Sequence, residues 1–256
     1  VHDLEARDEY PHDIVARMKE MGLFGCIIEE QYGGLGLSAS TYARIVARIT
    51  QSWMSLSGII NSHLIMASAV QRHGTSRQKA RFLPRFATGE LRGGVGLTEP
   101  DCGTDLQAIR TTARRDGDEY VVNGSKTWIT NSQEGDCLAL LVKTDKTATP
   151  PHRGMSLFIA EKGPGFAVTR KLEKLGYRGI DTCELQFDDY RLPAENLIGG
   201  AEGRGLQQVL SGLELGRINV AARGVGLAQA ALDMAVAYDR GPDRLRRRRP
   251  PAPSPG

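Results

Sequence analysis

The sequence has few features of a secreted, membrane or metal-binding protein. Four of its 256 residues are cysteines, and they lie far apart without a CxxC pair, at Cys26, Cys102, Cys137 and Cys183. This spacing argues against a zinc site and a disulfide scaffold. No apolar run approaches the roughly 18 residues of a membrane helix, and residues 1–10 are polar and acidic, unlike a secretory signal. We therefore expect a soluble protein of the reducing cytoplasm with no membrane partner.

Common catalytic and phosphate-binding signatures are missing as well. The sequence contains no GxxxxGK[ST], HExxH or GxSxG, and GVGLAQ at 224–229 ends in Gln229, where a dinucleotide fingerprint requires Gly or Ala. The histidines show no ligand spacing: His2, His12, His63, His73 and His152. These absences disfavour P-loop nucleotide binding, zinc-protease chemistry and serine-hydrolase chemistry, and we expect no metal site.

The net charge of +3 does not indicate a nucleic-acid-binding surface. Residues 240–256 contain six arginines and one aspartate, which leaves a charge of −2 for the rest of the chain. The same segment holds five of the twelve prolines and has no apolar periodicity. We predict that residues 241–256 are disordered and that the protein has no nucleic-acid partner. A contact between the basic run and RNA, DNA or lipid is the alternative.

Apolar residues at helical spacing predict an N-terminal helical domain over residues 1–92. The first expected helix ends at Gly22, and its core face comprises Ile14, Val15, Met18 and Met21. Further helices are expected within 40–73 and over 76–87, where Ser76 can act as the cap. The glycine-rich segment 29–38 predicts a loop between them.

After Gly93 the pattern becomes that of β-strands. β-favouring residues lie on both sides of Asn123-Gly124, a dipeptide that predicts a hairpin turn. Further strands are expected at 137–143, 155–160, 165–169 and 182–188. Their turns are rich in Gly and Pro and no helix separates them, which favours an antiparallel barrel or sandwich over a Rossmann sheet for residues 93–198.

A long helix is expected from Arg204 to Asp239, with a length of about 54 Å at the usual rise per residue. A helix of that length needs packing partners, which the remaining sequence does not supply. The predicted fold class is therefore α+β: an all-α N-terminal domain, a middle antiparallel β-barrel domain, and an incomplete C-terminal helical bundle that begins with residues 199–240.

Four segments, in order and spacing, resemble the acyl-CoA dehydrogenase family of flavoproteins. They are MGLFGCIIEEQYGGLGLS (21–38), GVGLTEPDCGTDLQAI (94–109), DEYVVNGSKTWITN (118–131) and GIDTCELQFDDYRLPAENLIG (179–199). A fifth segment, 212–240, is similar to the opening helix of the family's C-terminal bundle. The resemblance implies that a full relative binds FAD and oxidises an acyl-CoA to the 2-enoyl-CoA. It also implies electron-transfer flavoprotein as the electron acceptor and a homotetramer or dimer.

The resemblance assigns roles to individual residues. Val95, Leu97 and Thr98 would line the flavin, Trp128 would pack beside its ring, and Thr130 would reach the ring nitrogen that accepts hydride. Gly103 and Thr104 would lie near the pyrophosphate and the CoA moiety. On the long helix, Glu214 and Arg217 would lie near the CoA end of the substrate.

The resemblance assigns no catalytic residue. Family members place a glutamate base just before an Arg in the opening helix, or in a loop near the far C-terminus. Here Gly216 precedes Arg217, and Glu214 is displaced by roughly 200° around the helix. After Tyr238 the match changes abruptly to Arg- and Pro-rich sequence, so we expect a chain truncated or frameshifted after the first bundle helix. Alternatives are a non-catalytic FAD- and acyl-CoA-binding fragment, a pseudoenzyme, or a related flavin monooxygenase or acyl-CoA oxidase.

Overall fold

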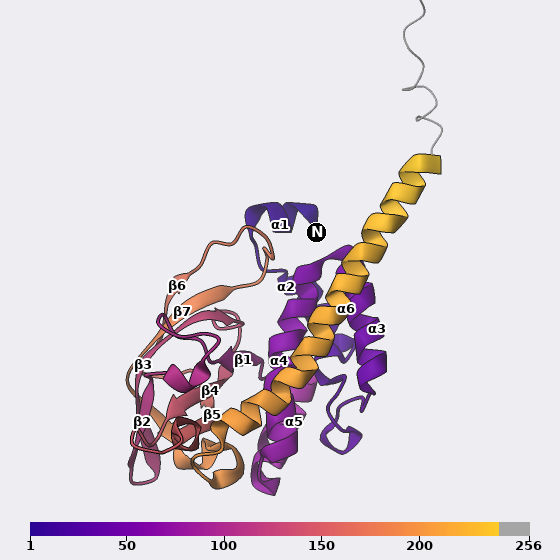
Figure 1. The fold of residues 1–256 in the computed structure, drawn as a ribbon. Helices are drawn as coiled ribbons and strands as arrows, with labels where there is room; N and C mark the ends of the chain where they lie inside the picture. The colour runs from indigo at the N-terminus through magenta and orange to yellow at the C-terminus, as the bar shows by residue number, and fades with distance from the viewer. Residues whose placement is uncertain (241–256) are drawn as a thin grey trace, which may run out of the picture.

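The structure is a computed structural model that describes residues 1–240. Residues 241–256, predicted to be disordered, lie outside the described residues. A group of helices lies beside a curled β-sheet, and one long helix runs across the helical group (Figure 1). This arrangement agrees with the predicted fold class of a helical domain, a β domain and the start of a second helical region.

The N-terminal region contains five α-helices within the described residues. They are α1 (His2–Arg7), α2 (His12–Glu20), α3 (Ala39–Ser52), α4 (Met54–His73) and α5 (Ser76–Thr88). Helix α2 stops before Gly22, whose φ of 72° is left-handed, but Met21 is 67% exposed and does not belong to the core face. Helix α5 is capped by Thr75 and not by Ser76, in a capping box with Gln78.

The predicted hairpin at Asn123-Gly124 is wrong. The turn lies at Gly117, between the antiparallel strands β2 (Thr112–Asp116) and β3 (Glu119–Thr130). Gly124 sits inside β3 at a shift in the register with β7 (Thr182–Pro193). A Cβ at Gly124 would lie 2.6 Å from the Thr111 hydroxyl, and the φ of 141° at this position also favours glycine.

The β domain is one seven-stranded sheet within the described residues, in the order β1-β4-β2-β3-β7-β6, with β5 paired to β4. Its other strands are β1 (Gly93–Gly96), β4 (Cys137–Lys143), β5 (Met155–Glu161) and β6 (Phe166–Lys171). The strands expected at 137–143, 155–160, 165–169 and 182–188 are present, but β1 and β2 were not predicted. The sheet is also not fully antiparallel, because β1 and β2 pair with β4 in parallel.

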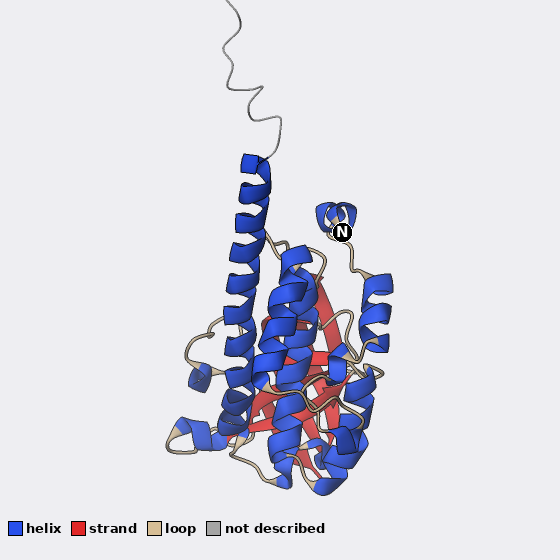
Figure 2. Ribbon diagram, turned by 90° about the vertical axis from the view of Figure 1, so that its right-hand side faces the viewer, coloured by secondary structure: helices blue, strands red, loops and turns tan. Residues whose placement is uncertain are grey.

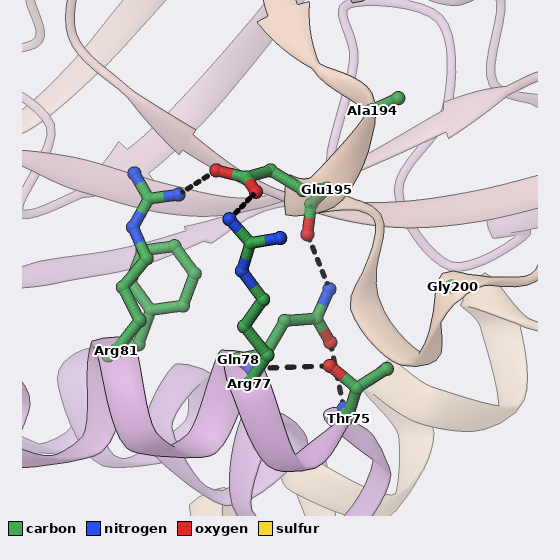
Figure 3. Close-up of a pocket in the computed structure, with 8 residues that line it drawn as sticks. Thr75, Arg77, Gln78, Arg81, Ala194, Glu195 and Gly200 are labelled. Carbon is green, nitrogen blue, oxygen red and sulfur yellow. Dashed lines mark hydrogen bonds and ion pairs between the residues drawn. The ribbon is translucent and has the colours of Figure 1, made fainter. Parts of the chain in front are cut away.

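The helical and β domains are joined along α5. In Figure 3, Arg77 and Arg81 reach across to Glu195, at 2.8 and 2.6 Å, beside a small pocket of about 140 Å³. Arg81 also pairs with Glu161 of β5 at 2.9 Å. The Gln78 amide donates to the carbonyl of Glu195. These charged and polar contacts hold the two domains together, so we assign this pocket to the domain junction and not to a functional site.

Helix α6 (Gly205–Arg240) has 36 residues and packs with its first two thirds on α3 and α4. Glycines allow the close approach, since a Cβ on Gly226 would lie 2.4 Å from the Ala47 carbonyl oxygen. Asn219 donates to the Tyr42 hydroxyl at 2.6 Å, and Arg223 donates to Asn219 and Tyr177. The last turns extend beyond the other helices (Figure 2), and every residue from 231 to 240 is exposed.

By length and composition alone, α6 could cross a membrane, since its mean hydropathy reaches 1.2 over an 18-residue window. The expectation from the sequence was that no segment would pass this test. The contacts of α6 favour a packed helix of a folded domain, because Asn219 and Arg223 bond to polar groups of α3 and the β6–β7 loop. Transfer of these side chains into lipid would remove their partners at a cost of several kcal/mol.

Candidate functional site

A pocket of about 590 Å³ opens at one edge of the β domain. It contains three of the predicted flavin-binding residues, Thr98, Gly103 and Trp128. The segment after β1 supplies Thr98 and Gly103, and the end of β3 supplies Trp128. The other walls come from β6, its C-terminal extension and β7, through Arg170, Leu172 and Glu184.

Trp128 has the conformation of a functional side chain more than that of a core residue. Its side chain is 58% exposed, and its backbone is left-handed with a φ of 60°. The β3–β7 register shifts between Lys126 and Ile129, so the indole leaves the regular pleat. A non-glycine residue with positive φ costs on the order of 1 kcal/mol, and such strain is found preferentially at binding sites.

The turn that carries Thr98 is hydrogen-bonded directly to the part of β3 that carries Trp128. The Thr127 amide donates to the Thr98 carbonyl at 2.9 Å. Within the first turn, the backbones of Glu99 and Cys102 exchange two hydrogen bonds, of 2.9 and 3.1 Å. Two chain segments that are far apart in sequence therefore form one rigid rim around the pocket.

A buried ion pair that the sequence does not predict connects the Thr98 turn to β3. The Lys126 ammonium lies 2.7 Å from the Glu99 carboxylate, with side-chain exposures of 0% and 6%. Burial opposes ionisation of Glu99, but Lys126 and hydrogen bonds from Thr111 and Arg110 outweigh it, so the pKa of Glu99 lies below its usual value. No spacing rule connects the two residues, so only their presence in the LTEP and NGSK segments could have drawn attention to them.

The predicted residues Val95, Leu97 and Thr130 are not among the residues that line this pocket. Val95 lies on β1 and Leu97 directly follows it, packed into the core, so Leu97 could contact a ligand through its backbone only. A Cβ on Gly94 would lie 2.3 Å from the Thr130 carbonyl oxygen, which places β1 against the end of β3. The Asn131 amide reinforces this junction by donating to Gly93 and to α4.

The three predicted substrate residues, Thr104, Glu214 and Arg217, are not brought into the described lining of this pocket. Thr104 is exposed just beyond Gly103. Glu214 is exposed on α6 and pairs with Arg72 of α4 at 3.3 Å. Arg217 is exposed on the same helix, while Gly216 is buried against Ile65, to which a Cβ would approach within 2.7 Å.

The pocket suits a flat, partly apolar ligand that accepts hydrogen bonds. It combines an exposed indole, a half-buried threonine and a guanidinium, and at Gly103 a Cβ would meet only Thr98, at 3.7 Å. An isoalloxazine ring requires such an aromatic wall, together with polar donors and room near its phosphates. The residues present therefore fit a flavin.

Comparison with known proteins matches both the helical domain and the β domain to one protein family. Residues 1–90 match the family model described as acyl-CoA dehydrogenase, N-terminal domain, and residues 94–190 match that described as acyl-CoA dehydrogenase, middle domain. The chain is 40% identical to (2S)-methylsuccinyl-CoA dehydrogenase of Cereibacter sphaeroides, over 93% of this chain and 45% of that protein.

Two solved structures extend the likeness to three dimensions. Butyryl-CoA dehydrogenase from Megasphaera elsdenii matches with a TM-score of 0.89 and 32% identity, over 100% of this chain and 66% of the other. A chain in a structure of the electron transferring flavoprotein of Acidaminococcus fermentans matches with a TM-score of 0.88 and 36% identity, over 93% and 63%. The chain thus spans between about half and two thirds of the length of these relatives.

Proposed function

The chain belongs to the acyl-CoA dehydrogenase family, and from that premise we propose that it binds FAD in the pocket between Thr98 and Trp128. The proposed reaction of the whole protein is the α,β-dehydrogenation of an acyl-CoA thioester to the 2-enoyl-CoA. The observation that carries the proposal is that Trp128, which is exposed and has a left-handed backbone, lines one open pocket together with Thr98 and Gly103.

The residues of this chain would hold the cofactor and the thioester. Trp128 would cover one side of the ring, the Thr98 hydroxyl and nearby backbone amides would donate to ring heteroatoms, and Thr130 would approach the ring from the end of β3. Gly103 and Thr104 would leave space for phosphates. When bound, the flavin supplies an acceptor for the hydride that leaves the β carbon.

The proton on the α carbon must be removed by a base, which the described part of α6 does not offer. Glu214 is exposed and already paired with Arg72, and Gly216 has no side chain. We propose that residues 1–240 supply the cofactor site without the carboxylate that removes this proton. This observation also favours the second candidate function, a protein that binds FAD and acyl-CoA without turnover.

We further propose that electron-transfer flavoprotein accepts the electrons and that the protein is a homo-oligomer. Support for the first comes from the structural neighbour described with such a flavoprotein. Support for an assembly comes from apolar side chains exposed along α6, among them Leu227, Leu232 and Met234. Exposed apolar patches of this kind usually contact other protein surfaces.

FAD binding by the purified 256-residue chain tests the cofactor proposal. We expect the chain to retain FAD through gel filtration, and Trp128→Ala to weaken binding about tenfold or more, which corresponds to about 1.4 kcal/mol. Leu175→Ala is the matched control, since Leu175 is a fully exposed apolar side chain outside the pocket. Equal FAD affinity in all three proteins, or no binding by the parent, contradicts the proposal.

Anaerobic addition of acyl-CoA to the FAD-loaded chain tests the argument about the base. Flavin absorbance that persists supports a binding site without the base. Bleaching would show that a base is present and would refute our interpretation of Glu214 and Gly216. If bleaching occurs and air restores the colour with formation of peroxide, the acyl-CoA oxidase alternative is favoured.

A further inference from the structure

The Glu99–Lys126 ion pair is unusual in that it is buried and yet adjoins the open pocket. Lys126 has a fully buried side chain, and its ammonium donates to the Leu97 carbonyl at 3.0 Å and to Glu99 at 2.7 Å. Removing two charges from water costs several kcal/mol per ion. A buried pair is therefore weak evidence for stability and needs another explanation.

The contacts of the pair connect three separate segments of the chain. Lys126 belongs to β3 and holds both residues that flank Thr98. Glu99 in turn accepts hydrogen bonds from the backbone amides of Arg110, at 2.5 Å, and Thr111, at 3.1 Å. The pair thereby connects the Leu97–Glu99 segment, the backbone at Arg110 and Thr111, and strand β3, which carries Trp128.

The bonds of the rim transmit this arrangement to both walls of the pocket. Thr127, the residue between Lys126 and Trp128, donates to the Thr98 carbonyl at 2.9 Å. A displacement of Lys126 would therefore move Thr98 and Trp128 relative to each other. The left-handed backbone of Trp128 needs such support, because strained conformations persist only where the surroundings determine them.

We infer that Glu99 and Lys126 are positioning residues, which set the separation between the Thr98 wall and the Trp128 wall before the flavin binds. This inference rests on the proposed flavin site for its ligand. Its structural part, the preformed spacing between the Thr98 turn and the end of β3 that carries Trp128, is independent of any ligand. Neither residue needs to touch the flavin, because Glu99 and Lys126 act through the backbone of the rim.

The double variant E99Q/K126M tests the inference. It removes both charges and the bond to Leu97 while it keeps similar side-chain volumes and an acceptor for one of the two amides, of Arg110 or Thr111, that donate to Glu99. We expect the FAD Kd to rise about tenfold or more, with urea unfolding still cooperative. K162M is the matched control, since Lys162 is a lysine bonded to a backbone carbonyl, that of Gln133, outside the pocket.

Acrylamide quenching of tryptophan fluorescence provides a readout without FAD. The chain has two tryptophans, and Trp53 is 3% exposed, so quenching reports on Trp128. We expect a changed quenching constant in E99Q/K126M and an unchanged one in K162M. If the parent binds no FAD, the proposed function fails, whereas the quenching comparison still decides whether the pair positions the rim.

A conservative variant decides the question if the double variant does not fold. E99D keeps the charge and shortens the side chain by one methylene, so the fold should persist while the rim is pulled towards the pair. We expect an intermediate rise in the FAD Kd and a quenching change of smaller size. A folded E99D or E99Q/K126M with the parent's FAD Kd and quenching constant would overturn the inference.

Discussion

The buried histidine of α4 gives a pH dependence of stability whose sign and size follow from its contacts. His63 is fully buried between Phe24 and Phe86, with ring centroids 5.3 and 5.6 Å away. Its Nε2–H donates to the Phe86 carbonyl at 3.1 Å, and its Nδ1 is buried without a partner. Burial disfavours the imidazolium and outweighs the hydrogen bond to Phe86, which favours it. The net effect lowers the pKa of His63 from 6.5 to about 4.

Between pH 6.5 and about 4, His63 is therefore protonated in the unfolded chain but not in the folded chain. Well above pH 6.5 His63 is unprotonated in both states and its full contribution to stability is present. As the pH falls from 6.5 towards about 4, the free energy of unfolding should decrease by about 1.4 kcal/mol per pH unit, or about 3 kcal/mol over the interval. Below pH 4 the contribution of His63 no longer changes.

His63→Gln removes the titrating group while it keeps an N–H donor for the Phe86 carbonyl. Urea unfolding of both proteins at several pH values between 7.5 and 4.5 measures the effect. The variant should be less stable than the parent at pH 7.5, yet lose less stability on acidification. His152→Gln, which changes an exposed histidine, is the control and should keep the parent's slope. Parallel pH profiles of the parent and His63→Gln would refute the reasoning.

Three further predictions concern the pocket, the domain junction and α6. Trp128→Gly should leave the free energy of unfolding within about 1 kcal/mol of the parent or raise it, because glycine tolerates positive φ; a large loss in urea unfolding contradicts this. Arg81→Met breaks two ion pairs and should cost about 1 kcal/mol in low salt and less in 1 M NaCl; an unchanged difference in high salt argues against the pairs. Gly226→Ala should lower the melting temperature, because its Cβ would lie 2.4 Å from the Ala47 carbonyl, whereas Gly224→Ala, with open space around it, should raise it. Equal shifts for the two glycines would contradict the packing of α6.

Periodicity and local turn chemistry predicted most elements, but not how they pair. The bounds of β4 and α6 were close to those observed because both follow from an uninterrupted pattern. The turn was placed at Asn123-Gly124 although Gly117 supplies it, since both sites carry a turn signal. The choice between them depends on β7, which pairs with β3 along its length and lies far away in sequence.

The site was predicted through resemblance more than through residue patterns. Thr98, Gly103 and Trp128 do line one pocket, whereas their spacing in the sequence gives no reason to expect it. The Glu99–Lys126 pair was missed because a lysine in an alternating strand reads as exposed. Its partners, Glu99 and the Leu97 carbonyl, lie in another segment of the chain, which hydrophobic patterning of β3 does not reveal.

The polar contacts of α6 also determine the direction of its last turns. Asn219 donates a hydrogen bond to the Tyr42 hydroxyl, and Arg223 donates one to the Tyr177 hydroxyl. A shift of the helix by one turn, about 5.4 Å, would therefore break both hydrogen bonds. Smooth apolar surfaces allow several such registers, and hydrogen-bonded ones select a single alignment. Residues 231–240 consequently extend from the rest of the protein along one defined axis.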